Sequence, residues 1–322
     1  MPIIRRALLA APLALPFAAH AAGEDWPNRP VRYINPYPAG GPTDTLSRIY
    51  CARMSELTGQ QFVVENRGGA GGNVGADAIA KSAPDGYTLG LGGIASHAIS
   101  PTLYKTLPFD PERDFTLVGG IWQVPNLLAV HPSVPAQTVP ELIALLKANP
   151  GKYSFASSGA GTTVHLSGEI FKHMAGVDML HVPYRGSAPA LIDLTAGRVH
   201  MMFDNMPGTL ALVRDGKVRP IAVTSAARSP TAPEIPAIGE TLPGYELVSW
   251  TCISGPAGLP RPMVARLARF THQALDSAEL VQAYFNQGAA AWPTTEAQIN
   301  RHVAEQRAKL APLIRASGAV VD

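Results

Sequence analysis

Strand-like and helix-like segments alternate along this chain, and the alternation limits the possible fold more than any single motif does. Short apolar runs rich in β-branched residues occur at 31–35, 61–65, 87–92, 115–121, 126–131, 153–156, 179–182, 199–203, 219–224 and 246–253. Segments of helical period lie between and after them, at 45–57, 74–83, 138–149, 163–175, 188–196, 207–215, 262–277, 278–287 and 295–317. Helices that follow strands in this order predict an α/β protein with mostly parallel sheets.

The length of the chain and two connecting segments predict two lobes. The 322 residues exceed what one hydrophobic core usually serves, which is about 250–300 residues at most. A proline-rich stretch at 229–243 and an extended stretch near 122–126 are the natural places for the chain to pass between lobes. We therefore expect a first lobe of residues 22–123 and 248–322, with residues 124–247 inserted as the second.

Residues 1–21 have the pattern of an export signal. Arg5 and Arg6 form a basic start, 7–18 are apolar, and the small residues of Ala19-His20-Ala21 form a cleavage site. The apolar stretch is shorter than the roughly 20 residues that span a bilayer. We expect cleavage and a periplasmic location, with the general and the twin-arginine export routes both open.

The net charge belongs to this N-terminal segment. The whole chain has 26 basic and 24 acidic residues, and residues 1–21 hold two of the basic ones and no acid. The remainder is formally neutral and has no cluster of lysine and arginine with interleaved aromatics. A nucleic-acid-binding protein needs a basic face, so we expect no nucleic-acid partner.

The two cysteines, Cys51 and Cys252, leave two readings open. In an oxidising compartment they could form a disulfide, but sequence alone does not bring their Cα atoms within bonding distance. The alternative is two small buried thiols. No C-x-x-C occurs, which argues against a redox motif or a zinc knuckle.

The first glycine-rich turn, "YPAGGPTD" at 37–44, joins the first strand-like run to the first helix-like one. Gly40 and Gly41 let the backbone adopt positive φ and approach a ligand closely, and Thr43 or Asp44 can cap the helix. Free N–H groups at a helix start favour a carboxylate or phosphate. The turn lacks the lysine of a P-loop and the spacing of a dinucleotide fingerprint, so a nucleotide is not expected. A plain capped turn remains the alternative.

A second turn, "SSGAGTTVHLSGE" at 157–169, repeats this design in the other expected lobe. It offers Gly159 and Gly161 together with four hydroxyl side chains, from Ser157, Ser158, Thr162 and Thr163. Two such helix starts on separate lobes predict a ligand clamped between them. A third glycine-rich segment, "NRGGAGGNVGA" at 66–76, could also cradle an anion, but we favour tight packing of a helix on the sheet.

Two other groups of residues raise alternative functions, a metal site and a serine hydrolase. His165, Glu169 and His173 recur at helical spacing and could form a metal-binding stripe, but no fourth ligand or H-E-x-x-H accompanies them, and we expect no metal. His165 alone lies near the start of its helix and could point at a bound anion.

A serine hydrolase is the second rival. No G-x-S-x-G surrounds Ser157 or Ser158, and His181 and Asp204 could be partners only if the fold brought them together. Asp204 and Asn205, at the end of a strand-like run, fit a ligand contact from the second lobe. An N-cap for the following helix is the alternative role of Asp204.

Collinear motifs over essentially the whole chain after the signal resemble the extracytoplasmic receptors of tripartite tricarboxylate transporters, the Bug or TctC family. The motifs are "WPNRPVRYINPYPAGGPTDTLSR", "VVENRGGAGGNVGADAIAKSAPDGYTL", "LYKTLPFDPERDFTLVG", "SSGAGTTVHLSGEIFK", "HVPYRGSAPALIDLTAGRV", "DGKVRPIAVTS" and "GPAGLP". The resemblance implies a type 2 periplasmic binding protein: two lobes, a hinge and a ligand cleft between them, with no catalysis and no cofactor. It implies a small carboxylate ligand, such as a di- or tricarboxylate, an acidic amino acid or an aromatic acid.

The resemblance also implies roles for individual residues. The turn at 37–44 would wrap a ligand carboxylate, the turn at 157–165 would hold the ligand from the other lobe, and Asp204 could meet an amino group. Ser96, in "GGIASHAISP", matches another pocket loop. The candidate ligand-binding residues are Tyr37, Pro38, Ala39, Gly40, Gly41, Thr43, Asp44, Ser96, Ser157, Ser158, Gly161, Thr162, Thr163, His165 and Asp204.

Some positions depart from the family pattern. Tyr37 stands where phenylalanine is common, and "WTCISGPAG" has Cys252 in place of a typical glycine and Ser254 in place of a typical aromatic residue. These departures concern the lining of the pocket, and so the identity of the ligand, rather than the fold. If Cys252 faces the helix that carries Cys51, the disulfide becomes more plausible.

The sequence therefore predicts a monomeric periplasmic receptor that binds a small organic acid through backbone dipoles, without a full cationic side chain. It would deliver the acid to the permease subunits of a tripartite tricarboxylate transporter. A receptor that presents its ligand to a membrane histidine kinase and a hydrolase that uses Ser158 and a histidine remain the alternatives.

Overall fold

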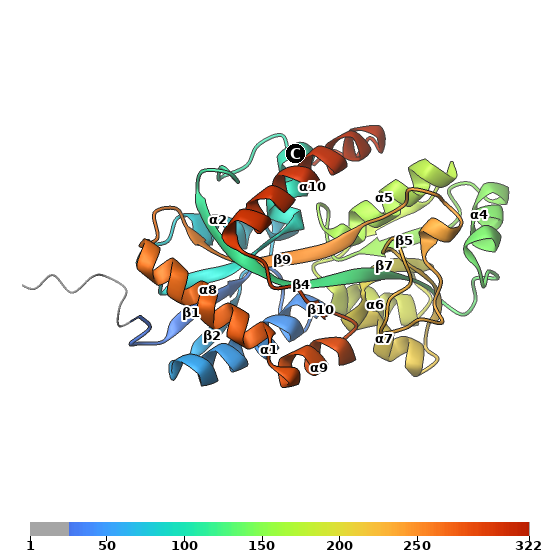
Figure 1. Ribbon diagram of the computed structural model, residues 1–322. Helices are drawn as coiled ribbons and strands as arrows, with labels where there is room; N and C mark the ends of the chain where they lie inside the picture. The colour runs from blue at the N-terminus through green and yellow to red at the C-terminus, as the bar shows by residue number, and fades with distance from the viewer. Residues whose placement is uncertain (1–25, 322) are drawn as a thin grey trace, which may run out of the picture.

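The computed structural model describes residues 26–321 and shows a mixed α/β fold whose strands belong to one curved sheet (Figure 1). The strands are β1 Val31–Asn35, β2 Phe62–Asn66, β3 Thr88–Gly93, β4 Phe115–Val130, β5 Ser154–Ser157, β6 Leu180–Pro183, β7 Met201–Asn205, β8 Arg219–Val223, β9 Val248–Pro256 and β10 Ala290–Ala291. The helices are α1 Pro42–Thr58, α2 Asn73–Ala80, α3 Ser100–Leu103, α4 Val139–Ala148, α5 Thr163–Ala175, α6 Ser187–Thr195, α7 Met206–Arg214, α8 Arg261–Leu275, α9 Ala278–Asn286 and α10 Glu296–Ala316. The expected export signal at 1–21 lies outside the described residues.

Most of these elements lie where the sequence pattern predicts them. β1 and α5 have the predicted bounds, and most of the other predicted elements differ by one to three residues at their ends. The sequence pattern did not predict α3, β10, the short 3₁₀ segments Ala70–Gly72 and Ile238–Glu240, or the π-helical turn Ala95–Ile99. Across residues 26–321, no helix combines the length and the apolar character needed to cross a bilayer.

The sheet is mixed rather than mostly parallel, so this part of the prediction is wrong. Its order is β2-β1-β3-β9-β4-β7-β5-β6, with β8 and β10 as further partners of β4. The outer strands are parallel, β1 to β2 and β3, and β5 to β6 and β7. The centre is antiparallel because β9 enters from the C-terminal part of the chain between β3 and β4 and opposes both.

One long strand, β4, replaces the two strands predicted at 115–121 and 126–131. It runs without interruption through Pro125, which still pairs with β9, and its partner changes at Asn126, which pairs with β7. The stretch expected to be a link between lobes is therefore a strand that changes partners. The division of the chain at 123/124 lies close to this change of partner and stays a proposal.

The helices gather around the two halves of the sheet as two lobes (Figure 1). α1 and α2 pack against β1, β2 and β3, and α8 and α9 pack on α1, whereas α5, α6 and α7 pack against β5, β6 and β7. α4 lies at the outer end of the second lobe (Figure 1). β4 and β9 lie between the lobes and extend into both (Figure 1). The loops at the carboxyl ends of the outer strands of both lobes consequently face the space between them, where ligands bind in open α/β sheets.

The two cysteines do not form a disulfide. Both thiols are free and buried. Cys51 belongs to the hydrophobic cluster that includes Tyr33, Tyr50 and Tyr284, whereas Cys252 belongs to a separate cluster on the other face of β9. The possible pairing is therefore contradicted because each side chain packs into a different core, and burial raises the pKa of both thiols.

Candidate ligand-binding site

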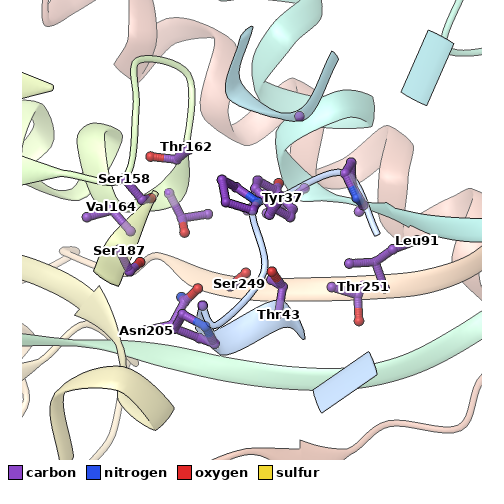
Figure 2. A pocket seen from close by; sticks show the side chains of 18 of the residues that line it. Tyr37, Thr43, Leu91, Ser158, Thr162, Val164, Ser187, Asn205, Ser249 and Thr251 are labelled. Atoms are coloured by element: carbon purple, nitrogen blue, oxygen red, sulfur yellow. The ribbon is translucent and has the colours of Figure 1, made fainter. Parts of the chain in front are cut away.

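A cavity of about 170 Å³ lies between the two lobes. Figure 2 shows Ser158, Thr162, Val164 and Ser187 on one side of it, with Tyr37 and Thr43 opposite. Its walls come from seven segments: Pro36 to Thr43 except Gly40, Gly72, Leu91 to Ser96 except Ala95, Ser158 with Thr162 to Val164, Arg185 with Ser187 to Pro189, Asn205, and Ser249 to Thr251. No aspartate or glutamate is among these residues.

Five helices begin at this cavity. The N-cap residues of α1, α2, α5 and α7 line it, and so does the first residue of α6; they are Gly41, Gly72, Thr162, Asn205 and Ser187. The first amides of a helix have no partner within the helix, and the helix dipole adds positive potential at the same place. A cavity with five such ends and no acidic side chain in its walls favours an anion.

The first turn is built differently from the prediction. α1 begins at Pro42, so Asp44 lies inside the first helical turn and caps nothing. Its carboxylate turns away from the cavity and accepts hydrogen bonds from the Gly40 amide at 2.9 Å, Asn66 Nδ2 at 3.0 Å and Arg48 Nε at 3.1 Å. Burial alone would raise the pKa of Asp44, but these hydrogen bonds outweigh it and the pKa is lowered. Gly40 and Asp44 therefore support the turn from behind and do not line the cavity.

Backbone conformation separates the two glycines of this turn. Gly40 has φ +77°, in the left-handed region that favours glycine. Gly41 has φ −87° and ψ 172°, which any residue adopts. Only Gly40 is required by the backbone, and only Gly41 lines the cavity.

In the second turn, too, some residues line the cavity and others lie on the side away from it. Ser158, Thr162 and Thr163 line the cavity. Thr162 caps α5: its hydroxyl oxygen accepts from the amide of His165 at 3.3 Å, and its hydroxyl donates to the Gly159 carbonyl at 2.7 Å.

Three of the predicted contact residues of this turn do not line the cavity. Ser157 bonds to His181 Nε2 at 2.7 Å, and His165 Nδ1 accepts from the amide of Gly161 at 3.4 Å. A Cβ on Gly161 would lie 2.9 Å from the ring of Tyr104, so this residue packs against the opposite lobe. Ser157, Gly161 and His165 therefore hold the turn in shape.

Two histidines are stacked behind the second turn. The His181 ring lies between those of Phe155 and His165, with centroid separations of 4.9 and 4.2 Å. Burial lowers the pKa of His165 to about 3 and that of His181 to about 4, so both rings are neutral near pH 7.

The three residues considered as a metal-binding stripe, His165, Glu169 and His173, do not lie together. His173 is exposed, and within residues 26–321 His181 takes its place beside His165 and Glu169, with ligand atoms within 4.8 Å of one another. The ammonium group of Lys172 lies 3.4 Å from Glu169 Oε2 and supplies that carboxylate with a cation. We interpret the cluster as support for the turn.

The geometry also argues against a serine hydrolase. His181 bonds to Ser157, which is fully buried, and not to Ser158, which lines the cavity. Asp204 is fully buried and its Oδ1 accepts from Ser187 Oγ at 2.7 Å. The three components of a triad therefore belong to different hydrogen-bonded pairs among the described residues.

Asp204 takes neither of its two predicted roles. It does not line the cavity, because Ser187 lies in front of it, and the N-cap of α7 is Asn205 rather than Asp204. Ser96 does line the cavity, from the π-helical turn Ala95–Ile99, and its hydroxyl lies 2.8 Å from His97 Nδ1.

A comparison with protein families identifies the family of this chain. The profile of the "Tripartite tricarboxylate transporter family receptor", TctC, matches residues 46–319. The chain belongs to this family.

Solved structures of similar chains agree with the assignment. R. palustris Rpa4515 with adipate is 40% identical, with TM-score 0.89, and the match covers 92% of this chain and 99% of that chain. The periplasmic binding protein BugD is 33% identical, with TM-score 0.87 and coverage of 92% and 99%. MatC (Rpa3494) from Rhodopseudomonas palustris with bound malate is 30% identical, with TM-score 0.84 and coverage of 90% and 100%. The tripartite tricarboxylate receptor fold, a periplasmic binding protein with two lobes and a ligand cleft, is therefore that of this chain.

Several residues at the cavity were missed by the sequence reasoning. Arg185 and Ser187 lie in "HVPYRGSAPAL", where a strand, a glycine and a helix start follow one another as in the first two turns. The same rule could have found them. Ser249 and Thr251 lie in the first half of β9, and no local sequence signal marks them as part of a site. Arg185 is the one charged side chain among the lining residues, a departure from the prediction of a site without cations.

Proposed function

We propose that this chain is a periplasmic receptor that captures a small carboxylate and delivers it to the permease subunits of a tripartite tricarboxylate transporter. The observation that carries the proposal is the convergence of five helix N-termini on one cavity without an acidic side chain. Preorganised N–H dipoles in a partly dry cleft replace the water around a carboxylate. Adipate and malate, which occupy related structures, are both dicarboxylates and support this ligand class.

The ligand contacts and the movement of the two lobes are part of the proposed function. Nine candidates line the cavity and are proposed as ligand contacts: Tyr37, Pro38, Ala39, Gly41, Thr43, Ser96, Ser158, Thr162 and Thr163. The lobes 22–123 with 248–322 and 124–247 would close around the ligand about β4 and β9. The protein would act as a monomer without a cofactor or catalysis, after removal of residues 1–21 on export.

A thermal-shift screen tests this function. The protein is unfolded and refolded to remove retained ligand, then heated with dicarboxylates, acidic amino acids and aromatic acids. A ligand at a hundred times its Kd stabilises the folded state by about 2.7 kcal/mol, so at least one acid should raise the Tm by several degrees. Matched amides of the same acids should leave the Tm unchanged. A screen in which no carboxylate raises the Tm would contradict the proposal.

Contacts across the cleft predict how closure contributes to affinity. Tyr104, from the first lobe, donates a hydrogen bond from Oη to the Ala160 carbonyl of the second turn at 3.2 Å. One neutral hydrogen bond contributes about 0.5–1.5 kcal/mol. Tyr104→Phe should therefore weaken ligand binding by roughly 2- to 10-fold in isothermal titration calorimetry.

The matched control is Tyr184→Phe. The Tyr184 hydroxyl donates to Asp193 Oδ2 at 2.8 Å within the second lobe, so it does not join the lobes. This variant should bind like the wild type. Equal affinities of the Tyr104 and Tyr184 variants would show that the contact with Ala160 does not stabilise the closed form.

A further inference from the structure

Asp204 is a buried carboxyl group that the proposed binding mode does not use. It is fully buried at the carboxyl end of β7, and its Oδ1 accepts from Ser187 Oγ at 2.7 Å. Its Oδ2 has no hydrogen-bond partner among the described residues. Apolar atoms lie near this oxygen: the position that a Cβ on Gly208 would take is 2.7 Å from Oδ2, 3.1 Å from Leu191 Cδ1 and 3.3 Å from Pro42 Cγ.

Burial raises the pKa of Asp204 to about 7, although the hydrogen bonds from Ser187 and the Asn205 amide oppose the rise. No charged group contributes to this shift. The titratable or charged side chains on the helices around it are Asp44, Arg48, Tyr50, Cys51, Arg53 and Glu56 on α1, His165, Glu169, Lys172 and His173 on α5, Asp193 on α6, and Arg214 on α7. β4 and β5 carry none. Asp204 therefore changes charge near neutral pH without a compensating cation.

The charge of Asp204 fixes the direction of the Ser187 hydroxyl. An ionised carboxylate only accepts hydrogen bonds, so Ser187 must donate to it and offers lone pairs alone to the cavity. A protonated carboxyl group can donate to Ser187 instead. The Ser187 hydroxyl, which lines the cavity at the start of α6, is then free to donate to a ligand.

Resting on the proposed function, we propose that Asp204 is a specificity-determining residue that couples capture of a carboxylate to uptake of one proton. In the protonated form, the Ser187 hydroxyl joins the helix N-termini as a donor to the ligand. In the ionised form, the Ser187 hydroxyl presents only its lone pairs to the ligand. The negative charge of Asp204 then lies close to the ligand carboxylate, with only the Ser187 side chain between them. Both effects make the neutral form of Asp204 the one that binds a carboxylate.

Carboxylate binding should weaken as pH rises through the pKa of Asp204. A ligand anion raises the pKa of Asp204 further, so binding takes up a proton when Asp204 is ionised in the free protein. Carboxylate affinity should be full at pH 6 and fall as pH rises through about 7, by roughly 30-fold at pH 8.5 if only the protonated form binds. Dicarboxylates are already mostly ionised at pH 6, and the ionisation that remains would strengthen binding as pH rises rather than weaken it. Burial lowers the pKa of His97 beside Ser96 to about 4. Neither therefore accounts for such a change.

Isothermal titration calorimetry tests the coupling. The refolded full chain is titrated with adipate at pH 6 and pH 8.5, in pairs of buffers with different ionisation enthalpies. The wild type should take up about one proton per ligand at pH 8.5 and close to none at pH 6. Binding at both values without proton uptake would overturn the inference and leave the proposed function intact. If adipate gives no heat at either value, the other dicarboxylates of the screen are titrated, and no binding by any of them would count against the function itself.

Two variants test whether Asp204 is the group that takes up the proton. Asp204→Asn keeps the shape of the side chain and cannot ionise, so its binding should lose both the pH dependence and the proton uptake. Asp193→Asn, on the outer part of α6, is the matched control and should keep both, because Asp193 bonds to Tyr184 and Arg198 outside the cavity. Proton uptake that persists in Asp204→Asn would assign the coupling to another group and contradict the inference. If this variant does not fold, the wild-type proton count alone decides.

Discussion

Replacing Gly41 by leucine is expected to abolish carboxylate binding while leaving the ligand-free protein as stable as the wild type. Gly41 has φ −87° and ψ 172°, and a Cβ there would meet only the Pro38 carbonyl, at an ordinary 3.6 Å. The backbone therefore accepts a side chain without strain. Because Gly41 lines a cavity of about 170 Å³, the leucine side chain takes space that the ligand needs.

The expected loss of affinity is at least about a hundredfold, which is close to 2.7 kcal/mol of binding free energy. Calorimetry measures the affinity, and urea unfolding of the ligand-free protein measures the stability. Gly41→Ala is the graded control, with a smaller loss of affinity and a stability equal to or slightly above that of the wild type. A leucine variant that binds as tightly as the wild type would show that the first turn is not part of the site.

Gly75→Ala, unlike the Gly41 variants, should lower the stability of the folded protein. In the interior of a helix, alanine is ordinarily more favourable than glycine by about 1 kcal/mol. Here a Cβ would lie 2.5 Å from Pro36 Cα and 2.9 Å from the Arg67 carbonyl oxygen, both of them backbone atoms. α2 or the segment at Pro36 must therefore move, and overpacking of this kind costs about 1–3 kcal/mol.

Urea unfolding without ligand measures this effect, and Gly41→Ala serves as the unstrained control. Because Pro36 lines the cavity, the Gly75 variant should also bind carboxylates more weakly than the wild type. A Gly75→Ala protein that is more stable than the wild type would show that α2 has room against the first turn. The third glycine-rich segment would then need an explanation other than close packing.

Local pattern predicted most elements because hydrophobic period and turn residues act over short stretches. β1 and α5 are examples, since glycine-rich turns or prolines bound them on at least one side. β4 was predicted as two strands because Gln123 and Pro125 interrupt its apolar pattern. Pairing with β9 carries the strand through this interruption, and no local signal reports a partner that lies more than a hundred residues away.

The site was predictable where it consists of helix starts and unpredictable where tertiary packing decides which side chain faces the ligand. Gly41 and Thr162 lie at helix starts that follow a strand and a glycine, a pattern visible in the sequence. Asp44 and His165 come from the same turns but do not line the cavity, because their side chains accept hydrogen bonds from neighbouring backbone amides instead. Asp204 was assigned to the ligand because its strand ends at the cleft, yet Ser187 from the next helix lies in front of it.

A crystal structure with a dicarboxylate that raises the Tm tests the central claim most directly. We expect the ligand between the two lobes, with one carboxylate about 2.7–3.2 Å from backbone amides at the starts of α1 and α5, near Thr43 and Thr163. The result that would contradict it is a ligand bound outside this cavity, or one whose carboxylates pair only with Arg185 and do not contact either helix start.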